Sequence, residues 1–258
     1  MLENQGAHVL EVKDLVKRFP KRSGLFSRSD EYKTAVDGVT FSIRAGEILG
    51  LVGESGCGKT TLGKTILRLY QKDSGSVKFK GEDVFQWSKD TLRAKRRYMQ
   101  MIFQHPDAAL NPRMKVIDIV TEVVKLYHPA LTRNAAKAKA LDRLDDVKLH
   151  KDKITRFPHQ LSGGEKRRVG IARILAANPE FIVADEPVSK LDVSLQGQII
   201  DLMLRLREEH RLTYLYISHD LQMVKRLSDR IAVMYLGKLV ELAPKSVIVR
   251  GEAQHPYT

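Results

Sequence analysis

Apolar and polar residues alternate in the first part of the chain, which indicates β-strands. Residues 8–12 (HVLEV) and 35–43 (AVDGVTFSI) follow a two-residue period with Gly and Asp as punctuation, a pattern typical of an antiparallel sheet. Residues 47–53 (EILGLVG) form a continuous apolar run, as expected for a strand that is buried on both faces of a parallel sheet. A glycine-rich loop and then a helical apolar pattern follow directly, up to residue 70.

The middle of the chain changes to helical periodicity. In residues 116–127 the apolar side chains fall on one helical stripe, and residues 135–149 are rich in strong helix formers. Thr132 is well placed to cap the N-terminus of the second helix. The pattern therefore predicts a helical insert. The stripe of the first helix consists of Val116, Val120, Val123, Val124 and Tyr127.

Strands and helices alternate around this insert, which predicts an α/β fold. Before it, residues 76–84 (SVKFKGEDV) predict a strand and a turn, and residues 98–104 (YMQMIFQ) predict a buried strand. After it, the expected elements are a helix at 167–177, a strand at 181–185, a helix at 195–210, a strand at 213–219 and a hairpin at 230–242. The sequence shows no internal repeat and no low-complexity linker.

Composition supports a globular protein. With 258 residues and 43% hydrophobic residues, the chain suffices for one domain with an insert or for two small domains. The single cysteine, Cys57, excludes an internal disulfide and a cysteine-rich metal cluster. No apolar run approaches the ~20 residues that span a bilayer, and no signal-peptide pattern is present, so we expect a cytoplasmic location.

The formal net charge of +13 does not select a partner by itself. Nucleic acid, an anionic membrane surface and nucleotide all attract a basic protein. Lys and Arg are scattered in short clusters, without a long basic tail or a stripe interleaved with aromatic residues. Solvated faces with some attraction to anionic lipid are therefore favoured over a DNA-binding groove.

Residues 53–60 (GESGCGKT) match the pattern G-x-x-x-x-G-K-[ST] between a predicted strand and a predicted helix, the context that a phosphate-binding loop requires. We expect Lys59 to reach the β- and γ-phosphates of a nucleotide and Thr60 to bind Mg²⁺. A chance glycine turn is the alternative, and Cys57 is interpreted as a small residue rather than a reactive thiol. The expected binding residues are Gly53, Glu54, Ser55, Gly56, Cys57, Gly58, Lys59, Thr60 and Thr61.

Residues 181–187 (FIVADEP) form an apolar strand that ends in two carboxylates. Asp185 is placed to hold Mg²⁺, and Glu186 to accept a proton from an attacking water. An acidic helix cap is the alternative for this pair. His219, at the end of YLYISH, is a candidate donor to the γ-phosphate, and Gln104, at the end of MIFQ, a candidate ligand of the metal or the water. Taken singly, such a histidine or glutamine is more often structural.

The ordered motifs GESGCGKTT, FQ, LSGGE, FIVADEP, SKLD and SHD resemble the ATP-binding subunit of an ABC transporter over nearly the whole chain. Within that family, MQMIFQHPDAALNPRM, DEPVSKLDVSLQGQI and HPYT are most similar to the peptide and nickel importers. The basic insert at residues 20–34 resembles the second of the two ATPase subunits that such systems pair.

This resemblance implies a P-loop NTPase fold, with a RecA-like core, an N-terminal antiparallel β subdomain and an inserted helical subdomain. Residues 1–258 would form a single ABC ATPase domain. Residues 1–104 and 166–258 would supply the β subdomain and the core. Residues 105–165 would form the helical subdomain, with the signature motif at its end.

The resemblance also implies roles for single residues. Phe19 would stack on adenine, with a plain core phenylalanine as the alternative. Gln104 would link the nucleotide to the transmembrane partner, and His219 would act as the γ-phosphate switch. Residues 189–192 (SKLD) would cross the dimer interface, although Lys190 replaces a usual small residue. The signature residues would contact the γ-phosphate on the partner's loop; they are Ser162, Gly163, Gly164 and Glu165, the last in place of a common Gln.

The implied function is an ATP-binding and hydrolysing subunit, with ATP and Mg²⁺ as cofactors, that powers import of di- or oligopeptides. The implied partners are a second, paralogous ABC ATPase subunit, two transmembrane permease subunits and, indirectly, an extracytoplasmic solute-binding protein, with no nucleic acid. The subunit would be peripheral on the cytoplasmic face of the membrane. Alternatives are a nickel or other small-solute importer, a non-transport ABC ATPase acting on nucleic acid, and an ATPase that exports or extracts lipid or protein. The sequence leaves open the solute, whether the partner ATPase is identical, and whether both ATP sites are active.

Overall fold

The computed structural model describes residues 8–20, 32–104 and 110–258. Most of the basic insert at residues 20–34, and part of the importer-like segment at 99–114, therefore lie outside the described residues. Packing divides the chain into two compact units. Unit 1 consists of Met1–Leu92 and Thr213–Thr258, and unit 2 of Arg93–Leu212.

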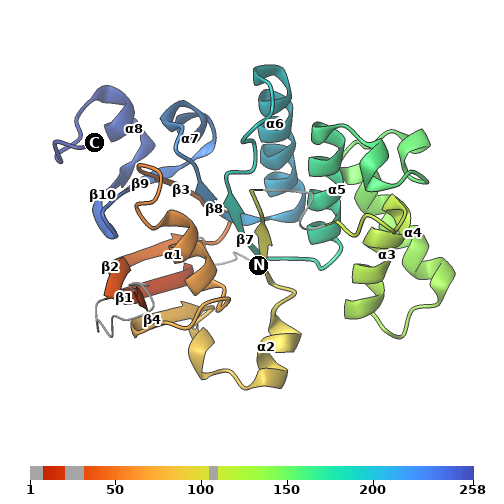
Figure 1. The fold of residues 1–258 in the computed structure, drawn as a ribbon, viewed down its shortest axis with the longest axis horizontal. Coiled ribbons are helices and arrows are strands. Elements are labelled where there is room, and N and C mark those ends of the chain that lie inside the picture. The colour runs from red at the N-terminus through yellow and green to blue at the C-terminus, as the bar shows by residue number, and fades with distance from the viewer. Residues whose placement is uncertain (1–7, 21–31, 105–109) are drawn as a thin grey trace, which may run out of the picture. The chain divides into compact units, whose positions relative to one another are not determined.

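The N-terminal part of unit 1 is a four-stranded antiparallel sheet in the order β2-β1-β4-β5 (Figure 1). It confirms the strands that the two-residue period predicts, but β1 and β2 are longer than expected, because their pairing continues beyond the alternating segments across several register shifts. The strands are β1 His8–Pro20, β2 Tyr32–Arg44, β4 Ser74–Phe79 and β5 Glu82–Asp83.

A second group of strands in unit 1 has the order β10-β9-β3-β8. Strand β3 runs parallel to both of its neighbours, while β9 and β10 form the predicted hairpin. Every residue of β3 is buried, which confirms the expectation for its continuous apolar run, and β8 is buried throughout as well. The strands are β3 Ile48–Val52, β8 Thr213–Ile217, β9 Arg230–Tyr235 and β10 Lys238–Pro244.

Short helices complete unit 1. Helix α7 packs against β3 at Gly50, where a side-chain carbon would lie 2.2 Å from Val224 Cγ1. A glycine at this strand position therefore allows the close packing of the helix. The helices are α1 Lys59–Ile66, α7 Leu221–Leu227 and α8 Lys245–Arg250, with a 3₁₀ turn at Val84–Gln86; α2 Lys89–Lys95 spans the boundary between the units.

The described residues of unit 2 include two parallel strands, β6 Met99–Ile102 and β7 Phe181–Asp185, and four longer helices. The stripe predicted for α3 is buried except for Tyr127, which is partly exposed. Thr132 caps α4 as predicted, since its hydroxyl accepts a hydrogen bond from Ala135 N at 3.3 Å. The helices are α3 Val116–Tyr127, α4 Arg133–Asp146, α5 Gly163–Leu175 and α6 Val193–His210, with 3₁₀ turns at Lys151–Lys153 and Pro158–Gln160.

Helix α5 begins at Gly163, four positions before the start at residue 167 that the apolar pattern predicts. The reason is a reciprocal cap. Ser162 Oγ accepts a hydrogen bond from Glu165 N at 3.3 Å, and Glu165 Oε2 accepts one from Ser162 N at 2.8 Å. This capping box satisfies amides that otherwise have no partner, so the two glycines join the first turn despite their low helix propensity.

The two compact units do not follow the expected division of the domain. Packing groups β6, β7, α5 and α6 with the helical segment, because α5 contacts α3 and α4 on one side and β6 and α6 on the other. The division with a helical insert at residues 105–165 thus stays a prediction.

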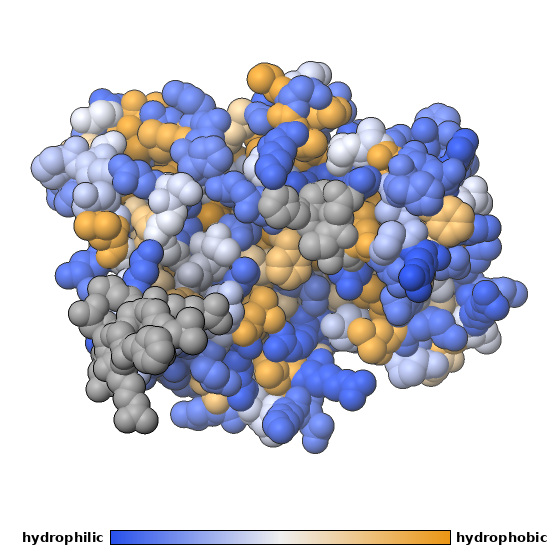
Figure 2. All heavy atoms as spheres, viewed as in Figure 1, coloured by the Kyte–Doolittle hydropathy of each residue, from blue (hydrophilic) through white to orange (hydrophobic). Residues whose placement is uncertain are grey.

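Hydrophilic residues cover most of the face shown in Figure 2, and hydrophobic residues occupy smaller patches between them. Among residues 8–20, 32–104 and 110–258, no helix combines the length and the apolar character needed to cross a membrane.

The capping box predicts a pH dependence of stability. The hydrogen bond from Ser162 N, aided by the nearby Lys153 ammonium, holds the pKa of Glu165 below its ordinary value of 4.5. A depressed folded-state pKa stabilises the protein above the ordinary pKa, and this stabilisation is lost as the pH falls through the folded value. Glu165→Gln should therefore lower the free energy of unfolding by about 0.3–1 kcal/mol at pH 7, from the lost charge at a helix N-terminus.

The measurement is urea unfolding of both proteins between pH 7 and pH 3. The difference between them should shrink below the ordinary pKa of glutamate. The control is Glu208→Gln, which removes an exposed charge near the end of α6, away from any helix N-terminus. A difference that stays constant across this range would contradict the stabilising role of the Glu165 charge.

Candidate functional site

The predicted loop and His219 lie at the same edge of a sheet in unit 1. Strands β3 and β8 are parallel, with Leu51 paired to Ile217, so the segments that follow the two strands leave the sheet side by side. The carboxyl edge of parallel strands is the usual place for a ligand in an α/β protein. Strands β6 and β7 repeat this arrangement in unit 2, with Ile102 paired to Ala184, so Gln104 and the acidic pair share an edge.

Glycine is required at both ends of the phosphate-binding loop. Gly53 and Gly58 have φ angles of 154° and 115°, which side-chain-bearing residues rarely adopt. A side-chain carbon at Gly53 would lie 2.1 Å from Met234 O, and one at Gly58 would lie 2.0 Å from Ala35 O. The loop backbone therefore presses against neighbouring backbone, which fixes its curvature.

Lys59 begins α1 and folds back across the loop. Only 6% of the residue is exposed, and its Nζ donates hydrogen bonds to Gly53 O at 2.7 Å and Glu54 O at 2.8 Å. The ammonium group and the first amides of α1 thus bring positive charge to the concave side of the loop. Thr60 is exposed in the same first turn, followed by the partly exposed Thr61. This arrangement is a cradle for phosphate groups.

Cys57 is buried inside the loop. Its Sγ lies 3.7 Å from Lys59 Nζ and would lie 2.9 Å from a side-chain carbon at Gly53. This burial favours a small packed residue over a reactive thiol at the surface. Glu54, Ser55 and Gly56 form the exposed tip of the loop.

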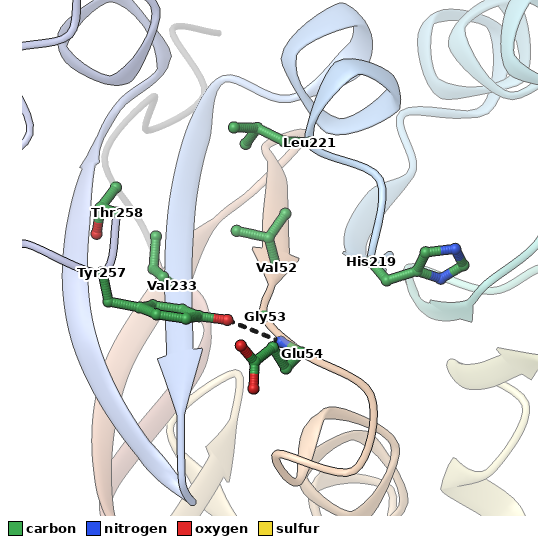
Figure 3. Close-up of a pocket in the computed structure, with 8 residues that line it drawn as sticks. All are labelled: Val52, Gly53, Glu54, His219, Leu221, Val233, Tyr257 and Thr258. Carbon is green, nitrogen blue, oxygen red and sulfur yellow. Dashed lines mark hydrogen bonds between the residues drawn. The ribbon is translucent and has the colours of Figure 1, made fainter.

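His219 is exposed directly after β8, while its neighbours in the SHD motif support the fold. Ser218 Oγ accepts a hydrogen bond from Asp220 N at 2.9 Å, and Asp220 caps α7. His219 lines a cavity of about 270 Å³ together with Gly53 and Glu54 (Figure 3). The structure thus brings this histidine near the start of the loop.

Phe19 lies on β1 and is partly exposed, which disfavours a plain core phenylalanine. Its ring meets Tyr70 edge to face with centroids 5.4 Å apart, and Lys17 Nζ lies 5.1 Å from its centroid. A partly exposed ring held in this way offers surface for stacking.

In unit 2 the structure brings Gln104 and Glu186 together. Gln104 Nε2 donates a hydrogen bond to Glu186 Oε2 at 2.6 Å. Glu186 has a φ of 46°, a left-handed conformation that costs roughly 1–3 kcal/mol for a residue with a side chain and is concentrated at functional sites. Asp185, the last residue of β7, is 4% exposed.

Sequence reasoning missed Arg167, which is 2% exposed on α5. Its guanidinium donates hydrogen bonds to Phe103 O at 2.6 Å and Gln104 O at 2.8 Å, so it holds the backbone from which the Gln104 side chain projects. A signal was present, because residue 167 shares the helical stripe of Ile171 and Ile174. A basic residue on an apolar stripe indicates a buried partner.

The signature residues lie at the N-terminus of α5. Ser162 and Gly163 are exposed at this helix N-terminus, a kind of position that favours an anion. Gly164 is buried, and a side-chain carbon there would lie 3.4 Å from Leu195. The carboxylate of Glu165 turns toward Ser162 N, and its expected contact with nucleotide stays a prediction.

The SKLD segment leads into α6. Asp192 Oδ1 accepts a hydrogen bond from Leu195 N at 2.9 Å and caps the helix, and Lys190 has a φ of 62°. Its expected place at a dimer interface also stays a prediction.

Within the described part of the chain, no group of three or more His, Cys, Asp or Glu side chains is arranged to hold a metal ion. Magnesium does not need such a cage, because it usually takes one or two carboxylates together with substrate phosphates and water. The hydroxyl of Thr60 and the carboxylate of Asp185 supply oxygen ligands of the kind that Mg²⁺ prefers.

Known proteins are similar to this chain in sequence. The family model described as ABC transporter matches residues 36–189. The oligopeptide transport ATP-binding protein AppF of Bacillus subtilis is 50% identical over 97% of this chain and 76% of its own length. OppF of Streptococcus mutans is 47% identical over the whole chain and 81% of its own length. The glutathione import ATP-binding protein GsiA of Escherichia coli is 46% identical over 98% of this chain but only 40% of its own length.

Solved structures share the fold. A dimeric structure of the ATP-binding cassette MJ0796, in a post-hydrolysis state bound to ADP and Pi, has a TM-score of 0.80 at 27% identity and covers 92% of this chain and 98% of that one. The cassette cbiO1 from Clostridium perfringens has a TM-score of 0.81 at 23% identity, over 95% and 92% of the two chains. The P-loop NTPase fold is therefore confirmed, and the chain belongs to the ABC transporter family as an ATP-hydrolysing cassette.

Proposed function

We propose that this ABC ATPase powers the import of peptides through separate membrane subunits. The observation that carries the proposal is the 50% identity to an oligopeptide transport ATP-binding protein over nearly the whole chain. The phosphate-binding loop supports it, because its geometry suits a nucleotide. The relative named for glutathione import points in the same direction, since glutathione is itself a small peptide.

In this proposal, the loop of residues 53–61 and Lys59 hold the phosphates of ATP. Thr60, Asp185 and Gln104 are the proposed ligands of Mg²⁺. The ion, when bound, would neutralise charge on the β- and γ-phosphates. Phe19 stacks on adenine, and the partial exposure of its ring suits that role.

Glu186 is the proposed general base. Gln104 holds its carboxylate at 2.6 Å, which orients the oxygen that would take a proton from the attacking water. Arg167 supports this pair by fixing the backbone of Gln104. His219 donates a hydrogen bond to the γ-phosphate, so loss of that phosphate on hydrolysis would be sensed directly.

The signature residues Ser162, Gly163, Gly164 and Glu165 complete a partner subunit's ATP site rather than this chain's own. An exposed helix N-terminus supports this part of the proposal, because its amides suit an anion brought by another chain. Residues 189–192 would lie at the same interface. ATP then closes the dimer, and hydrolysis opens it.

The proposed partners are a second ABC ATPase subunit, two transmembrane permease subunits and an extracytoplasmic solute-binding protein that acts through them. The chain would lie at the cytoplasmic face of the membrane. A nickel or other small-solute importer is the second candidate. An ATPase acting on nucleic acid has only the net charge of +13 in its favour.

Glu186→Gln should bind ATP with nearly unchanged affinity but hydrolyse it at least about a hundredfold more slowly, because the base is lost while the shape is kept. ATP binding and phosphate release by the assembled ATPase dimer are the measurements. Lys59→Ala is the matched variant that should lose binding. Normal turnover by Glu186→Gln would remove Glu186 as the base.

Ser162→Arg should leave ATP binding by the isolated subunit nearly intact but abolish hydrolysis at the site loaded on the partner. The arginine would fill the exposed start of α5, where the partner's γ-phosphate is expected. Equilibrium binding and single-site hydrolysis in dimers with one altered subunit measure the two effects. Loss of binding in the monomer would contradict the assignment.

A tagged chain expressed in its source cell should co-purify with integral membrane subunits. In proteoliposomes, its ATPase activity should rise when a peptide-loaded receptor is added. Receptor loaded with nickel, and receptor without solute, are the controls. Stimulation by nickel alone would select the second candidate, and recovery with nucleic acid instead of membrane subunits would overturn the import proposal.

A further inference from the structure

The segment Gln254–Thr258 returns to the start of the phosphate-binding loop. The hydroxyl of Tyr257 accepts a hydrogen bond from Glu54 N at 3.0 Å, although the two residues lie 203 positions apart. Figure 3 shows the Tyr257 side chain pointing at this nitrogen, while His219 points away from it. A contact of such long range fixes the position of one specific amide of the loop.

The carboxylate of Glu241 on β10 anchors this segment. It accepts hydrogen bonds from Gln254 N at 2.9 Å and His255 N at 3.4 Å. Burial alone would raise the pKa of Glu241, but hydrogen bonds from the segment, those of these two amides among them, hold it below its ordinary value. The ionised carboxylate is therefore the form that binds the segment.

The ring of Tyr257 packs against Tyr235 at the end of β9, with centroids 4.5 Å apart and an angle of 37° between the planes. Tyr257 N also donates to His255 Nδ1 at 3.2 Å, which tightens the turn that carries the ring. The packed ring and the anchored turn thus hold the Tyr257 hydroxyl next to Glu54 N.

The amide that Tyr257 contacts belongs to the same peptide group as a carbonyl that Lys59 contacts. Glu54 N–H and Gly53 C=O are the two ends of one planar unit. Tyr257 binds its nitrogen end, and Lys59 Nζ binds its oxygen end at 2.7 Å. Rotation of this peptide would break both hydrogen bonds, so Tyr257 constrains the group that holds the lysine.

We propose that Tyr257 is a positioning residue for the phosphate-binding loop, with Glu241 as the anchor that delivers it. The inference rests on the proposed nucleotide site. By fixing the Gly53–Glu54 peptide, Tyr257 orders the start of the loop before ATP binds and keeps the Lys59 ammonium over the cradle. ATP binding then loses less conformational entropy of the loop, and this raises the affinity for ATP.

The test is Tyr257→Phe, which removes the hydroxyl and keeps the ring on Tyr235. A fluorescent ATP analogue should bind the purified chain about twofold to tenfold more weakly, the range expected for one hydrogen bond. Hydrogen exchange at the Glu54 amide should become faster, while the thermal midpoint falls by only about a few degrees, as expected for one hydrogen bond. Tyr127→Phe, which removes a hydroxyl on α3 in unit 2, should change none of these.

Glu241→Ala tests the anchor. Alone, it should weaken binding as Tyr257→Phe does, and in the Tyr257→Phe background it should add little, because both act through one hydrogen bond. Fully additive effects would contradict the anchor role. Lys59→Ala separates the two proposals. If it binds the analogue normally, the nucleotide site itself is wrong. If it loses binding while Tyr257→Phe changes neither affinity nor Glu54 exchange, the positioning role is overturned.

Discussion

The approach of the phosphate-binding loop to its neighbouring backbone is the constraint on which the rest of the site depends. Gly53 lies against Met234 O and Gly58 against Ala35 O, so strands on both sides of the loop set its curvature. This curvature places Gly53 O and Glu54 O where both accept hydrogen bonds from Lys59. The hydrogen bond from Gly237 N to Cys57 O adds a further tie to the turn after β9. A loop held in this way presents its amides without further ordering.

Elements with a clear periodicity could be predicted from the sequence, and those that depend on distant partners could not. The buried runs of β3 and β8 and the stripe of α3 follow directly from the order of apolar residues. The start of α5 could not be predicted in this way, because its first turn contains glycines and is fixed by a cap rather than by an apolar pattern. The lengths of β1 and β2 were missed for a similar reason, since pairing across register shifts hides the alternation.

The functional site, like the fold, could be predicted from the sequence only where its residues form a local pattern. The loop and the acidic pair could be recognised because each is a local pattern beside a strand. The support of Gln104 by Arg167 joins residues 63 positions apart, and the contact of Tyr257 with Glu54 joins residues 203 apart. Both use backbone atoms as partners, and a backbone atom leaves no mark on residue identity. Such contacts become visible only when the fold brings the segments together.

Several groups whose hydrogen bonds stabilise the site would also form hydrogen bonds with a bound nucleotide. Lys59 Nζ donates to two loop carbonyls, and phosphate oxygens would also attract it as stronger partners because they are charged. Ser162 Oγ makes the longer bond of its capping box, at 3.3 Å, while the Glu165 carboxylate makes the shorter one, at 2.8 Å. If Ser162 turned toward a phosphate, the bond from Ser162 N to Glu165 would remain, so the start of α5 would stay capped. Glutamine at position 165 would retain a carbonyl acceptor for Ser162 N, but it would lose the favourable charge at the helix N-terminus.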